Sequence, residues 1–549
     1  MRNLVIALKT MASNLTRGIQ EPSSREGAEG FSGEVNAAQA SSSIGRNTFW
    51  NVLGTGLPMV LALVTIPVVI HSAGAARFGV LTIAWAVLGY FGNFDLGLGG
   101  ATIRFLAEAF EHRRVAESRG IFWTSVLLSG LVGAISACLL AALTPWLVGG
   151  VLNVPLGLRV ETQGAFYFLA MGVPLTTVTS TLRGTLEAKH RFGLVNALQV
   201  PNSALTQAAP LLALIVSQDL RWLVGAMVLS RAWGAGVFLV AALQNLENPF
   251  EGPFFLHEKL RVLLSYSAWQ AITNSISPLM ANADRFVIGA ITSMTTVAYY
   301  ATPAEFINRL GIIPQSLART TFPIFSAGVN IQERSRVYIK ATKYLALVLV
   351  PLVATIVVFA PQLLGLWVGP SFAQSSARVM QILAVGLLLN SLASLPFGLI
   401  QGIGRPDITA KFHMFELPLY ILLLWYGTQT WGITGTAVAW TLRVGLDFLL
   451  LILYVQWTNR VNMQAAESQV HRIVWASLLF LATAGLVETL ITGLLPKLCV
   501  WGLVLSLAAL AAWRWLLMAE EKNRIAERVR RLATMDKTLF AVEHKGTKR

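Results

Sequence analysis

The sequence contains few charged residues and almost no cysteine. Asp, Glu, Lys and Arg make up only 13% of its 549 residues, whereas soluble domains average about 25%. The two cysteines, Cys138 and Cys499, each lie inside an apolar run, and the seven histidines are scattered. These spacings exclude a disulfide framework and a zinc or iron–sulfur site built on Cys-x-x-Cys pairs. We therefore expect neither a metal nor another cofactor.

Hydrophobic residues are abundant instead. They form 55% of the chain, and the mean hydropathy is +0.61. From about residue 46 onward, apolar windows of roughly 20 to 28 residues repeat, each long enough to cross a bilayer as a helix. The sequence thus predicts an all-α polytopic membrane protein with about 14 transmembrane helices. The predicted spans are residues 47–70, 79–103, 121–148, 161–185, 193–217, 221–244, 262–290, 294–325, 341–368, 377–401, 408–429, 432–457, 472–493 and 496–518.

The net charge of +15 is concentrated in short loops and in the C-terminal tail. In a soluble protein this charge would indicate nucleic-acid binding. Here it indicates membrane orientation and attraction to anionic lipid headgroups, and no nucleic-acid partner is expected. The loops after even-numbered spans hold fifteen Lys and Arg residues, and the loops after odd-numbered spans hold five. Because positive residues gather on the cytoplasmic side, we place the even-numbered loops and both termini in the cytoplasm.

Polar segments flank the apolar part of the chain. Residues 1–43 are rich in Ser, Gly, Ala and Glu, which predicts a disordered cytoplasmic extension. Residues 519–549 form a basic cytoplasmic tail whose apolar spacing favours a helix on the inner leaflet, with a partner-binding tail as the alternative. The predicted units between them are an N-terminal six-helix bundle at 44–250, a C-terminal six-helix bundle at 251–462, and accessory helices 13 and 14 at 463–518.

Two stretches of the chain resemble each other. In the first, GTLEAKHRFGLVNALQVP leads into a span, a short loop and LVGAMVLSRAWGAGVFLVAAL. In the second, GLIQGIGRPDITAKFHMFELP leads into a span, a short loop and GITGTAVAWTLRVGLDFLLLI, and Arg231 and Arg443 occupy corresponding places. Six spans per half relate the halves by an axis along the membrane normal. Although channels and some membrane enzymes also repeat, this arrangement is common in secondary transporters, so we expect two pseudo-symmetric bundles around a central cavity.

Ionisable residues inside the predicted spans are expected to face that cavity or one another, because each costs about 2.5–3.5 kcal/mol at the centre of a membrane helix. A spacing of four residues predicts two ion pairs, Glu305 with Arg309 and Arg443 with Asp447. Arg231 has no acid within one helical turn. Since a guanidinium group matches phosphate oxygens, an excess of arginine in the cavity suits an anionic ligand. The acids could tune these arginines, or they could carry coupling protons or cations.

Four segments follow one another in order between about residues 44 and 457. They are SIGRNTFWNVLGTGLPMVLALVTIPVVI, RFGVLTIAWAVLGYFGNFDLGLGGATIRFLAE, NADRFVIGAITSMTTVAYYATPAEFINRLGIIPQSLARTTFPIFS, and LIQGIGRPDITAKF followed by GITGTAVAW. In this order they resemble the polysaccharide-transport branch of the multidrug/oligosaccharidyl-lipid/polysaccharide exporter superfamily, which includes Wzx-type flippases.

The resemblance implies a flippase rather than an enzyme. Its substrate would be an oligosaccharide on a polyprenyl pyrophosphate, moved by alternating access from the inner to the outer leaflet of the inner (cytoplasmic) membrane. It implies membrane lipids, a coupling proton or sodium ion, and polysaccharide polymerases or glycosyltransferases as partners. The implied substrate-binding residues are Arg104, Arg231, Arg285, Arg309 and Arg443, and the implied coupling or charge-pairing residues are Asp95, Asp284, Glu305 and Asp447.

Three other functions remain open from the sequence. A multidrug exporter of the same superfamily would favour acids over arginines in the cavity, because its substrates are cations. A flippase for the peptidoglycan lipid precursor shares the chemistry and the helix count. A membrane glycosyltransferase or polymerase typically needs a large extracytoplasmic loop or catalytic acids near an interface, and every odd-numbered loop here is short.

Overall fold

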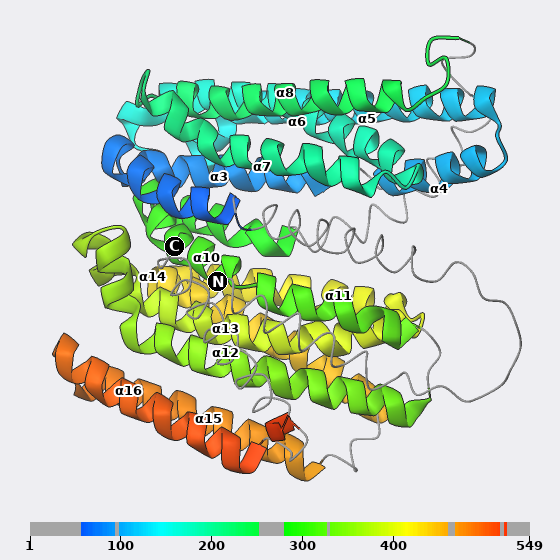
Figure 1. Cartoon of the computed structure of the whole chain (residues 1–549). Helices are drawn as coiled ribbons and strands as arrows, with labels where there is room; N and C mark the ends of the chain where they lie inside the picture. The colour runs from blue at the N-terminus through cyan, green and yellow to red at the C-terminus, as the bar shows by residue number, and fades with distance from the viewer. Residues whose placement is uncertain are drawn as a thin grey trace, which may run out of the picture.

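The computed structural model describes Gly56 and residues 58–93, 98–251, 279–326, 330–458, 467–516 and 521–523 (Figure 1). Within these residues the regular structure is entirely helical, as the sequence predicts. Eight of the described helices are long and apolar enough to cross a membrane. Outward-facing leucine and isoleucine side chains form a stripe along one of them, at Leu127, Leu131, Ile135 and Leu139, which is how a lipid-facing helix surface looks. The chain is therefore a multi-pass membrane protein.

The first group of helices, called the N-terminal group here, lies in residues 58–251. Helix α6 is its centre, because α3, α4, α5 and α8 all pack against it, and α7 packs against α8. Its helices are Pro58–Ala73, α3 (Ala75–Asn93), α4 (Leu98–Glu111), α5 (Val115–Trp146), α6 (Arg159–Ala188), α7 (Phe192–Leu214) and α8 (Leu220–Gln244), with short turns η1 (Leu147–Val151) and η2 (Leu156–Leu158).

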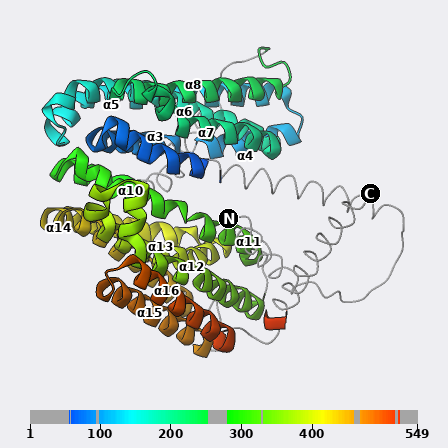
Figure 2. The same ribbon diagram turned by 60° about the vertical axis from the view of Figure 1, so that its left-hand side comes forward.

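The second group, called the C-terminal group, lies in residues 279–458 and stacks beside the first (Figure 1). Its helices are residues 279–291, α10 (Met294–Arg309), α11 (Ile312–Ser326), α12 (Ile331–Trp367), α13 (Pro370–Gly402) and α14 (Pro406–Trp457). Helix α13 packs between α12 and α14. Both views show α15 (Glu467–Leu490) and α16 (Leu494–Ala511, followed by η4, Ala512–Leu516) outside this group, along α12 (Figures 1 and 2).

Local signals in the sequence set several helix starts. Asp219 accepts a hydrogen bond from the Arg221 amide at 2.8 Å and begins α8. Before α10, the Ser293 side chain accepts a hydrogen bond from the Thr296 amide at 3.2 Å. Before α12, the Asn330 side chain accepts one from the Glu333 amide at 2.8 Å. Each side chain satisfies an amide that has no partner within its helix, which fixes where the span enters.

The long helix α14 is two antiparallel arms rather than one rod. Gly432 has a φ of 58°, a left-handed conformation that favours glycine, and it breaks the helix where the sequence predicts a loop between two spans. Gly427 and Gly435 then lie backbone to backbone, so that a methyl group on either would collide with the other. Thr428 and Thr436 hydrogen-bond across the same contact at 2.8 Å. The arm before the turn therefore lies against the arm after it.

The two groups meet mainly through one end. Asn153, between α5 and α6, donates from its backbone to Gly289 and from its side chain to Ala290, both at 2.8 Å. The indole N–H of Trp367 donates to the Leu63 carbonyl at 2.7 Å. Gly79 of α3 sits against the backbone of Met294, which leaves no room for a side chain at that position. These contacts cluster near the loops that follow odd-numbered predicted spans.

Each predicted span overlaps a described helix, although the count of fourteen membrane crossings stays a prediction. The predicted span 294–325 is divided into α10 and α11, because the chain turns at Leu310 and Gly311 and Pro314 cannot donate to the Leu310 carbonyl. Helix α12 begins ten residues before its predicted span at 341, since a polar, capped turn extends it beyond the apolar window. The predicted extension 1–43 and most of the tail lie outside the described residues.

The close contact between Gly427 and Gly435 gives a first testable prediction. Gly435→Ala should lower the free energy of unfolding by about 1–3 kcal/mol, because the added methyl group has to push the two arms apart. The matched control is Gly236→Ala in α8, where the new methyl group meets no atom within 4 Å. Thermal unfolding of the detergent-solubilised protein measures both. Equal melting temperatures for the two variants would contradict the tight hairpin.

Candidate functional site

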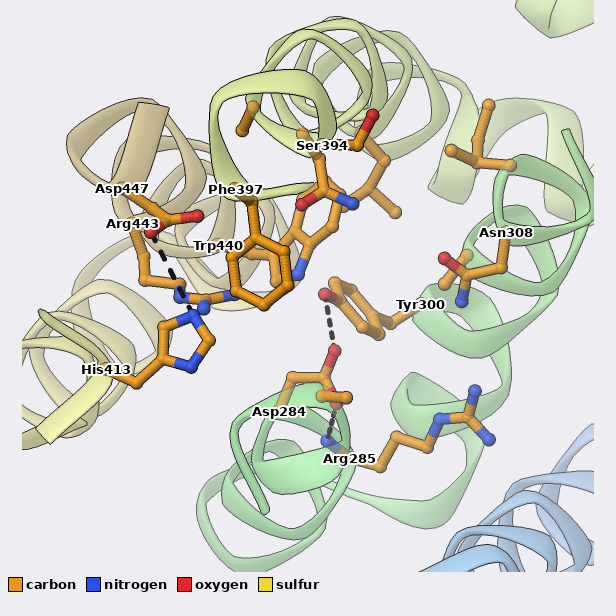
Figure 3. Close-up of a pocket in the computed structure, with 16 residues that line it drawn as sticks. Asp284, Arg285, Tyr300, Asn308, Ser394, Phe397, His413, Trp440, Arg443 and Asp447 are labelled. Carbon is orange, nitrogen blue, oxygen red and sulfur yellow. Dashed lines mark hydrogen bonds and ion pairs between the residues drawn. The ribbon is translucent and has the colours of Figure 1, made fainter. Parts of the chain in front are cut away.

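A cavity of about 360 Å³ lies inside the C-terminal group. Four elements surround it: the helix at 279–291, α10, α13 and both arms of α14 (Figure 3). Its lining combines charged, aromatic and amide side chains, which is unusual for the inside of a membrane helix bundle. Among the lining residues are Asp284, Arg285, Tyr300, Asn308, Asn390, Ser394, Phe397, His413, Trp440, Arg443 and Asp447.

Asp284 is held on one wall of the cavity. Its carboxylate is 6% exposed and accepts a hydrogen bond from the Tyr300 hydroxyl at 2.8 Å and another from the Arg285 backbone amide at 2.7 Å. Figure 3 shows Tyr300 reaching across from α10 to this carboxylate. Two donors satisfy the buried charge, so that Asp284 is fixed in one orientation.

Arg285 points away from Asp284 and joins the two helix groups. Its guanidinium group donates to Glu305 at 2.7 Å and to the carbonyl of Thr82 in α3 at 3.2 Å. Glu305 also accepts from Arg309 at 3.2 Å, which confirms the pair predicted from their spacing. One carboxylate therefore binds two arginines, and one of those arginines contacts the N-terminal group.

The other predicted pair, Arg443 with Asp447, is wrong. Arg443 donates instead to Glu416 at 3.2 Å, across the hairpin of α14. Asp447 lies 3.9 Å from the ring of His413. The hairpin of α14 explains this change of partner, because it brings the arm with His413 and Glu416 against the arm with Arg443 and Asp447. Arg443 therefore bonds an acid on the opposite arm instead of the acid one turn away on its own arm.

His413, Glu416 and Asp447 form a compact cluster. One ligand atom from each lies within 4.8 Å of the others, a spacing that could hold a cation or a shared proton. Glu416 is 1% exposed, and one oxygen of its carboxylate has no hydrogen-bond partner, as is also true of Asp447. The Arg443 guanidinium already bonds Glu416, and its positive charge opposes a metal ion at the same place.

The charges around the cavity do not produce the arginine excess that the sequence predicts. Arg285, Arg309 and Arg443 are each bonded to a carboxylate. Among the described residues, the carboxylates in and beside the cavity outnumber these arginines by four to three. They are Asp284, Glu305, Glu416 and Asp447.

Glu305 and Arg309 lie beside this cavity rather than in its lining, where Glu305 bonds the lining residue Arg285, and the remaining predicted site residues that the structure describes lie elsewhere. Arg231 lies on α8 in the N-terminal group, one turn after the buried Met227, and its Nε atom is buried without a hydrogen-bond partner. Arg104 is exposed on α4, where its guanidinium group lies 5.7 Å from the centre of the Phe105 ring. Asp95 falls outside the described residues. The structure therefore gathers six of the nine predicted residues and leaves Arg104 and Arg231 apart from them.

Several residues in or beside the cavity were not predicted as site residues. His413 lines it and Glu416 lies beside it, and the two are three residues apart on one helical face, which is the signal that could have paired them with the Arg443 arm. Asn308, next to Arg309, is exposed although it belongs to a predicted span. The two aromatic residues, Phe397 and Trp440, carry no sequence signal, because aromatic residues are equally common in a buried core.

Comparisons with known proteins agree with the helical architecture. A family model described as "polysaccharide biosynthesis protein" matches residues 44–329. A protein of Shigella flexneri described as an O-antigen transporter is 30% identical over 415 residues, which cover 76% of this chain and 97% of that protein.

Two solved structures share the fold. An inward-facing multidrug resistance MATE family transporter of the MOP superfamily matches with a TM-score of 0.64 at 15% identity, over 74% of this chain and 97% of its own. The lipid II flippase MurJ, in an inward closed conformation, matches with a TM-score of 0.66 at 11% identity, over 86% of this chain and all of its own.

The shared carboxylate of Glu305 gives the second prediction. Glu305→Ala should destabilise the protein by about 3–5 kcal/mol, since it leaves Arg285 and Arg309 without their acid. Asp407→Ala is the control, because Asp407 also bonds two basic side chains, Arg405 and Lys411, but at the exposed start of α14. Thermal unfolding in detergent should show a large loss only for Glu305→Ala. A comparable loss for both would mean that burial adds nothing.

Proposed function

Because the chain belongs to the polysaccharide biosynthesis protein family, we propose that it is a flippase for surface polysaccharide biosynthesis. Its substrate is an oligosaccharide linked to a polyprenyl pyrophosphate, which it moves from the inner to the outer leaflet of the cytoplasmic membrane. The similarity to the O-antigen transporter of Shigella flexneri along most of both chains supports this substrate class. No chemical step is part of the proposal.

One observation carries the mechanism: a polar cavity lies inside an apolar helical protein. A lipid-linked sugar has a polar head that cannot enter hydrocarbon, whereas its polyprenyl tail can stay in the lipid. A polar cavity that opens to one leaflet at a time gives the head a path. The amides of Asn308 and Asn390 replace part of the water that the head loses on entry.

The contacts between the groups support alternating access. They lie near loops that the charge asymmetry places outside the cytoplasm, around Asn153, Gly289 and Ala290. In this proposal the described arrangement is closed on the outer side, and the substrate enters from the cytoplasmic side. Transport then needs these hydrogen bonds to break. The fourteen spans, the two six-helix bundles and the cytoplasmic termini belong to the same proposal.

The arginines take different roles in this mechanism. Arg231 is the main contact for the pyrophosphate, because its Nε atom is buried without a hydrogen-bond partner and no ion pair joins Arg231 to an acid among the described residues. Arg104 guides the headgroup at the surface of α4. Arg285, Arg309 and Arg443 hold the cavity together through Glu305 and Glu416, and reach substrate only when those acids release them. Asp284, Glu305 and Asp447, together with Asp95, are the groups for charge pairing or for coupling to protons or sodium.

A second candidate function has one observation in its favour. The acids near the cavity outnumber the arginines, as an exporter of cationic drugs would require. The acids are mostly engaged by arginine and tyrosine donors, which leaves little free negative charge for a drug. The likeness to the drug transporter concerns the fold alone, at 15% identity. We therefore rank the flippase first.

The third prediction concerns Arg231. In cells that lack this protein, lipid-linked oligosaccharide should accumulate on the cytoplasmic leaflet, and the intact gene should restore transport. Arg231→Ala should restore about ten- to a hundredfold less, because a charge-assisted hydrogen bond contributes about 1.5–3 kcal/mol. Arg183→Ala is the control, since Arg183 is half exposed on α6 and paired with Glu187. Leaflet-resolved detection of the lipid measures both.

Two results would contradict this prediction. Full transport by Arg231→Ala would remove Arg231 from the site. A normal leaflet distribution in the deleted strain, together with greater sensitivity to cationic drugs, would favour the drug exporter.

The fourth prediction tests the closure between the groups. In a protein without Cys138 and Cys499, Asn153→Cys and Ala290→Cys should form a disulfide on oxidation, because these residues are in hydrogen-bonded contact. The crosslink should abolish transport, and a reductant should restore it. Each single cysteine variant is the control. Continued transport by the crosslinked protein would show that this contact does not open.

A further inference from the structure

The cavity of the C-terminal group has the chemistry of a site for an uncharged polar ligand. Asn308 on α10 and Asn390 on α13 line it with exposed side chains, although both belong to predicted spans. Ser394, one turn after Asn390, donates to the Ser391 carbonyl at 2.6 Å and keeps its lone pairs for an acceptor role. Amide and hydroxyl groups at these places offer both donors and acceptors, which suits sugar hydroxyl groups.

Two aromatic rings complete the lining. The Phe397 ring stacks on His413, with 6.0 Å between ring centres and 17° between planes. The Trp440 indole packs on Gly386 of α13, where any side chain would collide with it. Both rings are thus held before a ligand arrives, and Figure 3 shows them on the cavity wall. A flat apolar ring beside amide groups matches a pyranose, which has apolar C–H faces and a polar edge.

The same cavity is poorly suited to the pyrophosphate. The two arginines that line it, Arg285 and Arg443, are each bonded to an acid, and the carboxylates of Asp284 and Asp447 also line it. An added negative charge about 4 Å from an unscreened carboxylate costs on the order of 4 kcal/mol at an effective dielectric constant of 20. A neutral sugar avoids that cost. The charges of the cavity therefore favour the uncharged sugar over the pyrophosphate.

The N-terminal group has an uncharged residue at the position that corresponds to Glu416 in the C-terminal group. His190 and Gly404 both have left-handed backbones, with φ values of 55° and 81°, and each is followed by an arginine that begins a helix. Counted from those arginines, Asn202 occupies the place of Glu416. Arg443 is therefore bonded to an acid, whereas Arg231 has an uncharged amide at the equivalent position of the facing helix.

We propose that the two groups divide the substrate between them. The cavity beside Phe397, Trp440, Asn308 and Asn390 is a subsite for an uncharged sugar ring, and Arg231 holds the pyrophosphate. This inference rests on the proposed flippase function and assigns its specificity to the C-terminal group. The cavity volume of about 360 Å³ lies at the lower end of small-molecule sites, so it takes only a small part of an oligosaccharide.

The test measures the two parts of the substrate separately on the full-length protein in detergent. Saturation-transfer NMR reports sugar binding with four probes: methyl glucoside, methyl galactoside, methyl N-acetylglucosaminide and the negatively charged methyl glucuronide. Equilibrium binding reports undecaprenyl pyrophosphate without a sugar. The variants are Asn390→Ala, Trp440→Leu and Arg231→Gln. Asn248→Ala is the control, because Asn248 lies in the exposed turn after α8, outside both proposed subsites, and its side chain donates to Glu251 at 2.9 Å.

We expect the variants in the cavity to weaken only sugar binding and the Arg231 variant to weaken only binding of the lipid pyrophosphate. At least one neutral glycoside binds to the intact protein, and methyl glucuronide binds at least about tenfold more weakly. Asn390→Ala and Trp440→Leu each lower the affinity for the neutral glycoside about five- to tenfold, which corresponds to a loss of roughly 1–1.4 kcal/mol. Both variants keep the affinity for undecaprenyl pyrophosphate. Arg231→Gln shows the reverse pattern. The exposed side chain of Asn390 makes its truncation safe for folding, so this variant decides the test if Trp440→Leu fails to fold.

Other outcomes overturn the inference in distinguishable ways. If undecaprenyl pyrophosphate binds but no neutral glycoside does, or if Asn390→Ala weakens the sugarless lipid equally, the division of the substrate is wrong and the flippase function stands. If methyl glucuronide binds best, the cavity selects negative charge and the charge argument fails. If neither lipid nor sugar binds, the proposed function itself fails.

Discussion

An ionisable side chain inside a hydrocarbon layer has to be neutralised by a neighbour, and this requirement shapes the C-terminal group. Glu305 bonds two arginines, Glu416 bonds a third, and Tyr300 donates to Asp284. Each of these links joins different helices or different turns of one helix, so the charges also fix how the helices pack. The cavity lies between the helices that these polar links connect.

Glycine makes this network possible. The turn at Gly432 and the backbone contact between Gly427 and Gly435 press the two arms of α14 together, and only then can Glu416 reach Arg443. At the other boundary, Gly79 lets α3 approach Met294 at the start of α10, close to where Arg285 reaches Thr82. Close backbone approach and charge pairing thus depend on each other, since a side chain at either contact would separate the acids from their bases.

The helices could be predicted from sequence, whereas the partners of the charges could be predicted only where they lie on the same helix turn. Hydrophobic windows locate a span because its length and apolarity are local properties. The pair Glu305 with Arg309 is also local, and it was predicted correctly. Arg443 with Asp447 has the same spacing but failed, because the hairpin brings Glu416 closer to Arg443. Spacing along a helix therefore predicts a pair only when no other helix supplies a competing partner. The arginine excess predicted for the cavity failed for a different reason, because Arg104 and Arg231 lie on other helices and do not line it.

The internal repeat places corresponding residues in the two groups but gives them different charges. Both contain a residue with a left-handed backbone before a helix, at His190 and at Gly404. In both, the following helical segment leads into a second one that carries an arginine, Arg231 in α8 and Arg443 in the second arm of α14. In one group that arginine is bonded to Glu416; in the other, Asn202 stands at the equivalent place and the Nε of Arg231 has no partner. A substrate with one charged and one uncharged part needs such an asymmetry. Under the proposed division of the substrate, the exchange of the acid Glu416 for the amide Asn202 is what gives the pyrophosphate and the sugar different binding positions.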